Sequence, residues 1–213
     1  MPRILHVLSQ RPGRTGSGVT LESLVRGARD AGYEQWAVLG VPSEDPHPSV
    51  ADLTPDRIHP LVFGRDRLDF PLPGMSDIMP YPSSIFSQLT EDQLERYRAA
   101  WTEHLTGVID KFRPDLIHTH HIWILSSLLK DIAPEIPVVD HCHATGLRQM
   151  ILAPHLAEEV RRGCARNDRF VVLHQGHATE LARCLAVDAE RIQIVGAGFR
   201  KDLFYPPRVP GDR

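Results

Sequence analysis

Histidine is concentrated at the ends of two short apolar runs of this sequence. The 213-residue chain has 12 histidines, and five of them lie in the segments HTHH (residues 118–121) and HCH (residues 141–143). Imidazole can transfer a proton, bind a metal ion or form hydrogen bonds with a ligand. The two segments therefore mark a candidate binding or catalytic site.

A metal centre is one interpretation of these segments. H-x-H-H and H-x-H are spacings found among zinc ligands, and neutral imidazole is a common ligand of Zn²⁺. A metallohydrolase with an H-x-H-x-D-H motif requires Asp after the second ligand, whereas Ile122 and Trp123 follow His121. We therefore expect no metal site, and a histidine-rich metallohydrolase remains an alternative function.

A glycine-containing loop near the N-terminus is the second candidate site. The segment TGSGV places Gly16 and Gly18 immediately before a helical pattern. Small residues let the backbone approach a ligand, and free N–H groups at a helix N-terminus favour a phosphate. The segment is not a G-x-G-x-x-G motif, because Leu21 occupies the position of the third glycine, and it has no P-loop Gly-Lys-Ser/Thr. A turn that only admits the helix is the alternative interpretation.

Other reactive side chains fit structural positions. Alternation along a strand directs Cys142 away from its two histidine neighbours, which predicts a buried thiol, and no G-x-S-x-G elbow occurs in the sequence. We expect His6 and His118 in the core and His155 and His177 on helix surfaces.

Composition excludes several function classes. A formal charge of -3 shows no basic excess of the kind that favours nucleic acid or an anionic membrane. The three cysteines are odd in number and lack a C-x-x-C pair, which predicts neither a disulfide framework nor a cysteine zinc site and favours a cytoplasmic location. The sequence contains no run of about 18 apolar residues, so we expect no integral membrane segment.

The elements that must position these residues follow a repeated strand and helix pattern. Apolar, β-branched runs recur about every 25 to 40 residues with helical patterns between them, which is typical of a parallel α/β sheet. The expected strands are residues 4–9, 35–41, 57–63, 115–120, 137–142, 169–174 and 191–198, and the expected helices are residues 19–33, 91–112, 124–132 and 155–165. We predict a single Rossmann-like domain with a mostly parallel sheet and helices on both faces.

A sheet of this kind binds its ligand at the carboxyl ends of the strands, where the strand order reverses. His118 and His120 alternate along one expected strand, and His121 begins the turn that follows it. His141 and His143 occupy corresponding positions one strand later. If the two strands are neighbours, the histidines converge on one rim.

The order of these segments resembles the amino-terminal domain of family 4 (group 1) glycosyltransferases, which have the two-domain GT-B fold. RILHVLSQ and the helix after TGSGV are similar to the opening of that domain, with Ser17-Gly18 at its paired-glycine position. PDLIHTHH resembles its Pro-Asp-hydrophobic-hydrophobic-His strand. PVVDHCHATG resembles the strand that ends in a His-Gly-Thr segment, with His143, Ala144 and Thr145 at those positions.

The resemblance extends over residues 3–207 and implies a domain organisation. It predicts a glycosyltransferase-like domain over residues 1–207 and the start of an interdomain linker over residues 208–213, with the donor-binding carboxyl-terminal domain missing from this chain. Glu95 and Glu103 match the E-x7-E spacing of that donor domain, but they lie about 12 Å apart along an expected helix with no glycine turn before it. We expect them on a solvated helix face.

The resemblance also implies a reaction and roles for residues. The expected reaction transfers a sugar, with retention of anomeric configuration, from a nucleotide-diphosphate sugar to a hydroxyl of a small-molecule or glycan acceptor, without a further cofactor. His143 is the expected catalytic contact to the donor sugar or acceptor. The expected substrate-binding residues are Gly16, Ser17, Gly18, His120, His121, Thr145 and Arg148. Little turnover is expected from this chain alone, and a non-catalytic sugar- or nucleotide-binding module is the alternative. The segment over residues 69–86 is a possible acceptor lid or simply a packed loop.

Overall fold

A seven-stranded parallel sheet organises the protein, whose computed structural model describes residues 1–196 and 198. The strand order is β3-β2-β1-β6-β7-β8-β9. The strands of this sheet are β1 (Arg3–Leu8), β2 (Glu34–Pro42), β3 (Ile58–Phe63), β6 (Leu116–His120), β7 (Val138–His141), β8 (Arg169–Val172) and β9 (Ile192–Ile194). The helices are α1 (Gly16–Asp30), α2 (Glu91–Phe112), α3 (Ile124–Ile132), α4 (Ala144–Leu152), α5 (Pro154–Cys164) and α6 (Gln175–Leu185). A two-residue parallel pair, β4 (Pro73–Gly74) with β5 (Ser84–Ile85), lies apart from the sheet.

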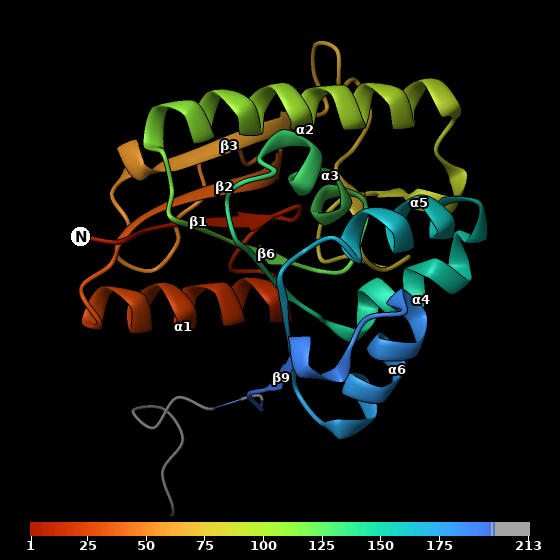
Figure 1. Ribbon diagram of the computed structural model, residues 1–213. Helices are drawn as coiled ribbons and strands as arrows, with labels where there is room; N and C mark the ends of the chain where they lie inside the picture. The colour runs from red at the N-terminus through yellow and green to blue at the C-terminus, as the bar shows by residue number, and fades with distance from the viewer. Residues whose placement is uncertain (197, 199–213) are drawn as a thin grey trace, which may run out of the picture.

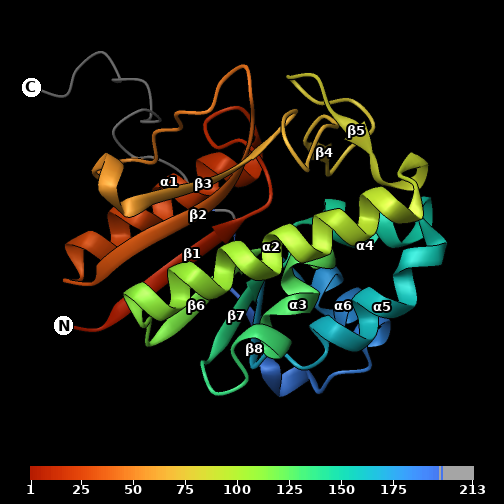
Figure 2. The same cartoon turned by 90° about the horizontal axis from the view of Figure 1, so that it is seen from above.

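Helices cover both faces of the sheet, as predicted. Helix α1 lies on one side and the long helix α2 on the other, which Figures 1 and 2 show from two directions. Alternate strand residues supply two separate cores. On β1, Leu5 and Val7 belong to the large core that includes α2, α3, α5 and α6, whereas Leu8 belongs to the small core under α1.

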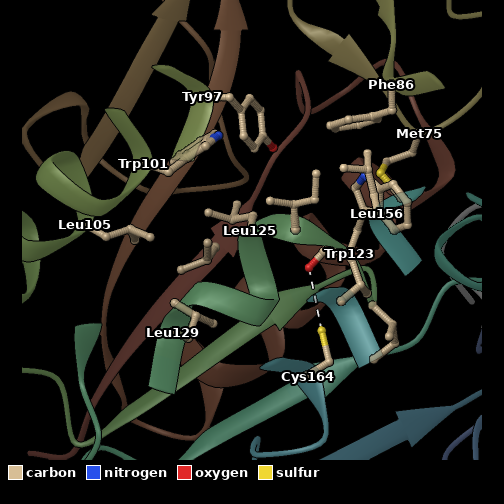
Figure 3. Close-up of a cluster of buried hydrophobic side chains, with 14 of the residues drawn as sticks. Met75, Phe86, Tyr97, Trp101, Leu105, Trp123, Leu125, Leu129, Leu156 and Cys164 are labelled. Atoms are coloured by element: carbon tan, nitrogen blue, oxygen red, sulfur yellow. Dashed lines mark hydrogen bonds between the residues drawn. The ribbon is translucent and has the colours of Figure 1, made fainter. Parts of the chain in front are cut away.

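The large core is built around aromatic side chains from several elements. Trp101 packs edge-to-face on Tyr97 in α2, and Tyr97 packs edge-to-face on Phe86. Phe86 in turn packs edge-to-face on Trp123 at 5.4 Å between ring centroids (Figure 3). The thiol of Cys164 donates to the Trp123 carbonyl at 3.6 Å. These contacts anchor the turn that follows β6, and this turn begins at His121, the last residue of the first histidine segment.

The strand order reverses beside β1. From β1 the chain moves to β2 and β3 on one side, and it then returns to β6, β7, β8 and β9 on the other. The loops that leave the carboxyl ends of β1 and β6 therefore diverge to opposite faces, and a crevice opens between them. This crevice receives both the glycine loop and the histidine segments.

Local sequence accounts for the limits of the elements. Helix α2 matches its predicted range, because Thr90 and Gln93 form a capping box at its start and Arg113, in a left-handed conformation before Pro114, ends it. The predicted strand over residues 191–198 is shorter, and β9 ends at Ile194. Ala197 and the chain from residue 199 onward, with the predicted boundary at residues 207 and 208, lie outside the described residues.

Two local predictions were wrong. Gly16 and Gly18 do not precede the first helix but form its first turn, because Thr15 is the N-cap. Helix α4 was not predicted, because none of the expected helices covers residues 144–152. Its N-cap, His143, makes no side-chain cap bond, so the usual start signal is absent from the sequence.

The two edges of the sheet differ from its centre. The edge strand β3 contains Pro60, which pairs with Leu39 of β2 and has no N–H group to donate. The other edge, β9, has only three residues. Among the described residues, no helix has both the length and the apolar character needed to cross a membrane.

Candidate functional site

A pocket of about 320 Å³ lies at the carboxyl ends of the central strands. Its walls come from three parts of the chain: the loop and first turn after β1, the loop before β5, and the start of α4. The lining residues are Gln10, Arg14, Thr15, Gly16, Ser17, Met75, Ser76, Ile78, Met79, Pro80, His143 and Thr145. The fold therefore brings the glycine loop and the second histidine segment to one mouth.

The two glycines of α1 have different surroundings. A Cβ at Gly18 would lie 2.7 Å from the Gly13 backbone nitrogen and 3.0 Å from the Pro12 Cα, whereas a Cβ at Gly16 would meet nothing within 4 Å. The N–H of Gly18 donates to the Thr15 hydroxyl at 3.1 Å, so it is occupied by the N-cap. Gly18 therefore shapes the loop from within, and Gly16 faces the pocket.

Ser17 lies between these glycines and is held in place by its hydroxyl. The Ser17 Oγ donates to the Gln10 Oε1 at 3.1 Å and lies 3.0 Å from the Thr15 Oγ1. The first N–H groups of an α-helix have no partner within the helix, and the helix dipole makes this end positive. The loop thus presents backbone donors to the pocket, and the exposed Arg14 is the cationic side chain in its lining.

Strand register assembles the histidines into a cluster. His6 of β1 pairs with His118 of β6, and His120 of β6 pairs with His141 of β7. Residues at alternate positions share one face of a sheet, so these four rings and that of His143 lie on the face opposite Thr119, Asp140 and Cys142. The His120 and His141 rings are nearly parallel, with an interplanar angle of 8° and centroids 5.5 Å apart.

Hydrogen bonds orient the residues at the pocket wall. The Nδ1 of His120 and the Nε2 of His143 lie 3.1 Å apart, so one ring donates to the other. The Thr145 hydroxyl lies 3.1 Å from the His121 Nδ1. His121 has a φ of 73°, which is rare for a residue with a side chain. This conformation ends β6 and turns the chain into α3.

Burial keeps the histidine cluster neutral. Loss of hydration lowers the pKa of His141 to about 4, and loss of hydration together with neighbouring histidines lowers the pKa of His121 to about 3 and that of His143 to about 2. The pKa values of His118 and His120 are lowered well below their usual range for the same reasons. At neutral pH these rings act as hydrogen-bonding groups and not as cations.

The expected site residues fall into three groups. Gly16, Ser17, His143 and Thr145 line the pocket; His120 and His121 support its wall from behind, and Gly18 packs beneath the loop. Arg148 is exposed on α4 and is not part of the lining. The structure thus brings together all of the expected residues except this arginine.

Sequence reasoning missed some of the pocket. Gln10 and Arg14 were not predicted, although both flank the glycine loop in the chain and that proximity is the signal that could have found them. The apolar wall of Met75, Ile78 and Met79 comes from the segment over residues 69–86, whose position beside the site was expected.

Several of the other candidates have the predicted structural positions, whereas His177, predicted on a helix surface, is half-buried. His6 is buried and its Nε2 lies 3.0 Å from the Gln35 Oε1, and His155 is exposed. Cys142 is fully buried in the large core, where loss of hydration raises the pKa of its thiol. Glu95 and Glu103 lie on the exposed face of α2.

Comparison with known proteins assigns the chain to a family. A family model described as the glycosyl transferase 4-like domain matches residues 15–198. The chain belongs to this family. The matched residues include the TGSGV segment, both histidine segments and most of the residues that line the pocket. A search of curated protein sequences finds no match for this glycosyl transferase 4-like domain.

Solved structures share the fold of the glycosyl transferase 4-like domain at low sequence identity. A sucrose-phosphate synthase from Thermosynechococcus elongatus superposes with a TM-score of 0.66 and 14% identity over 97% of this chain and 51% of the other. The lipopolysaccharide outer core galactosyltransferase WaaB gives a TM-score of 0.55 and 10% identity, covering 91% and 45%. A UDP-GlcNAc 2-epimerase from Methanocaldococcus jannaschii gives 0.54 and 11%, covering 91% and 45%. The chain thus spans about half the length of each of these proteins and has the fold of an amino-terminal GT-B domain.

Proposed function

We propose that this domain takes part in transferring a glycosyl group from a nucleotide-diphosphate sugar to an acceptor hydroxyl, with retention of anomeric configuration. The observation that carries the proposal is the shared pocket, which the glycine loop lines from one side and His143 and Thr145 line from the other. Because similar folds serve different reactions, the proposal rests on this site together with the family, and not on the fold alone.

The glycine loop is proposed to bind the diphosphate of the donor. In glycosyl transfer the charge that develops on the leaving phosphate must be stabilised. Gly16 and Ser17 form the first turn of α1 and line the pocket, so the positive end of the helix lies at the pocket wall. Arg14 adds a cationic side chain beside them. Gly18 contributes by allowing the loop to pack closely on the backbone of residues 12 and 13.

His143 is proposed to form a hydrogen bond with a hydroxyl of the donor sugar or acceptor. Its low pKa leaves it neutral, so it can donate from one ring nitrogen and accept at the other. His120 holds one of these nitrogens, and the Thr145–His121 pair supports the adjacent wall. Arg148, one turn further along α4, is proposed as a contact at the outer rim.

The segment over residues 69–86 is proposed as the acceptor side. It contributes Met75, Ile78 and Met79 to the pocket, and Ile78 is 88% exposed. Flexible apolar side chains at the mouth suit an acceptor that presents an apolar surface next to its hydroxyl. We propose a donor-binding domain outside this chain and a cytoplasmic location, consistent with free thiols at Cys142, Cys164 and Cys184.

A donor panel tests the proposed function. The full-length protein is assayed for sugar transfer and for donor hydrolysis with nucleotide-diphosphate sugars, alongside His143→Ala and the matched control His155→Ala, whose histidine is exposed on α5. We expect turnover with at least one donor, a loss in kcat/KM of about 100-fold or more in His143→Ala, and no change in the control. Donor turnover that is insensitive to His143→Ala, or no turnover with any donor, would contradict the proposal.

A further inference from the structure

A separate property of the histidine cluster concerns metal binding. We propose that His120, His141 and His143 form a binding site for one divalent transition-metal ion of the Zn²⁺ class. The three residues come from two adjacent strands and the start of α4, so no local sequence motif describes the set. The absence of an H-x-H-x-D-H motif from the sequence therefore does not argue against this site.

The distances between the three rings suit a shared ion. One nitrogen from each ring lies within 4.8 Å of the other two. A tetrahedral ion with Zn–N bonds of about 2.0–2.1 Å separates its ligand nitrogens by roughly 3.3 Å. The widest separation thus has to shorten by at most about 1.5 Å, which ring rotation about the side-chain bonds can supply. Rotation is needed because the His141 and His143 rings are nearly parallel, with an interplanar angle of 9°.

The ring nitrogens have bonding capacity that the described part of the protein does not use. His120 is 1% exposed and His141 is 3% exposed. The Nε2 of His120 and both ring nitrogens of His141 are buried without a hydrogen-bond partner among the described residues. Buried polar atoms are normally paired, because an unpaired group retains the full cost of losing water. A bound ion would satisfy lone pairs at the centre of this cluster.

The chemistry of the donor set selects the kind of ion. The set contains three imidazoles and no carboxylate, which favours Zn²⁺, Ni²⁺, Co²⁺ or Cu²⁺ over the oxygen-seeking Mg²⁺ and Ca²⁺. His143 lines the pocket and provides the route by which an ion reaches the buried pair.

Titration of the substrate-free chain tests the site directly. Untagged protein is stripped with a chelator and titrated with ZnCl₂ by calorimetry, and CoCl₂ is followed by its visible absorption. We expect one ion per chain, a tetrahedral Co²⁺ spectrum and no binding of MgCl₂. His120→Gln, His141→Gln and His143→Gln should each weaken Zn²⁺ binding by at least about 100-fold, because loss of a ligand should cost no less than loss of a residue that only orients a ligand, which costs about 10–100-fold.

The second histidine pair of the protein provides the matched control. His174 and His177 have ring centroids 3.9 Å apart at the start of α6, where they could bind a surface ion. The double variant His174→Gln/His177→Gln should retain full Zn²⁺ binding. The proposal is overturned if the folded wild type binds no stoichiometric Zn²⁺, or if binding is lost in this double variant and kept in His143→Gln. Circular dichroism confirms folding, and His143→Gln decides the outcome if the variants of the two buried histidines unfold.

Discussion

Gly16 and Gly18 lie two residues apart in α1, but substitution should affect them in opposite ways. In Gly18→Ala the new methyl group meets the backbone of Pro12 and Gly13, which cannot move without displacing the loop. We expect the free energy of unfolding to fall by about 1–3 kcal/mol, as in overpacked sites. Urea denaturation measures the change.

Gly16→Ala is the matched control for this prediction. Its Cβ would meet nothing within 4 Å, and alanine is a better helix former than glycine. We expect no loss of stability and a gain of up to about 0.5–1 kcal/mol. Equal losses in the two variants would contradict the packing difference between these positions.

His6 should make the stability of the protein depend on pH. Burial lowers its pKa from 6.5 to about 4, and the hydrogen bond with Gln35 opposes this only in part. Between pH 6.5 and about 4 the unfolded chain binds a proton that the folded protein does not, so the free energy of unfolding falls as pH falls. The full interval corresponds to ~3 kcal/mol for this group.

The measurement is chemical denaturation with a chelator present at pH 7, 6 and 5. His6→Leu should show a shallower pH dependence than the wild type, and the exposed variant His155→Ala should not. His118, whose ring lies 5.7 Å from that of His6, is the titratable neighbour that contributes further dependence in every variant. Equal pH dependence in wild type and His6→Leu would show that His6 is not the group responsible.

For single residues, the sequence predicts which side chains belong to the site better than it predicts how they are arranged. Strand-end histidines and a glycine turn are local signals, and both line the same crevice. The parallel register that places His120 beside His141 depends on which strands pair, so no local spacing predicts the three-histidine group. The close approach of Gly18 to residues 12 and 13 likewise depends on how the loop folds back.

At the scale of elements, the start of α2 should be sensitive to one hydroxyl. The N–H of Gln93 donates to the Thr90 Oγ1 at 3.2 Å, and the N–H of Thr90 donates to the Gln93 Oε1 at 3.0 Å. Thr90→Ala removes this capping box and should lower the free energy of unfolding by about 1 kcal/mol. Thr106→Ala, an exposed substitution in the same helix, should change it by less than about 0.5 kcal/mol. A thermal denaturation series in which the two variants match would refute the capping prediction.

Periodic elements were predictable, and elements defined by contacts were not. The 22 residues of α2 carry a repeated apolar pattern between a capping box and a proline, and the predicted range is confirmed. Helix α4 has nine residues and no side-chain cap, and its place depends on Gly146, whose missing side chain lets it lie against the backbone of Ile122. Tertiary contact of this kind has no counterpart in sequence periodicity.

At the scale of the whole molecule, the two cores should unfold together. Strands β1 and β2 supply alternate side chains to both: Val38 packs in the large core, and Ala37 and Leu39 in the small one. Neither core can lose its strands without opening the other, which predicts a single cooperative transition. Tryptophan fluorescence reports the large core through Trp101 and Trp123, and far-UV circular dichroism reports all helices including α1. Separate midpoints for the two signals would contradict the prediction.

The two edge strands of the sheet, β3 and β9, affect whether copies of the protein associate through their strands in solution. Open strands invite a neighbouring chain to continue the hydrogen-bond ladder, and proline or a very short strand interrupts that growth. Here Pro60 removes a backbone N–H donor from the edge strand β3, and the other edge strand, β9, has only three residues. Crowded or concentrated samples should therefore resist strand-mediated aggregation, and replacing Pro60 with a β-branched residue is the change that would expose this weakness first.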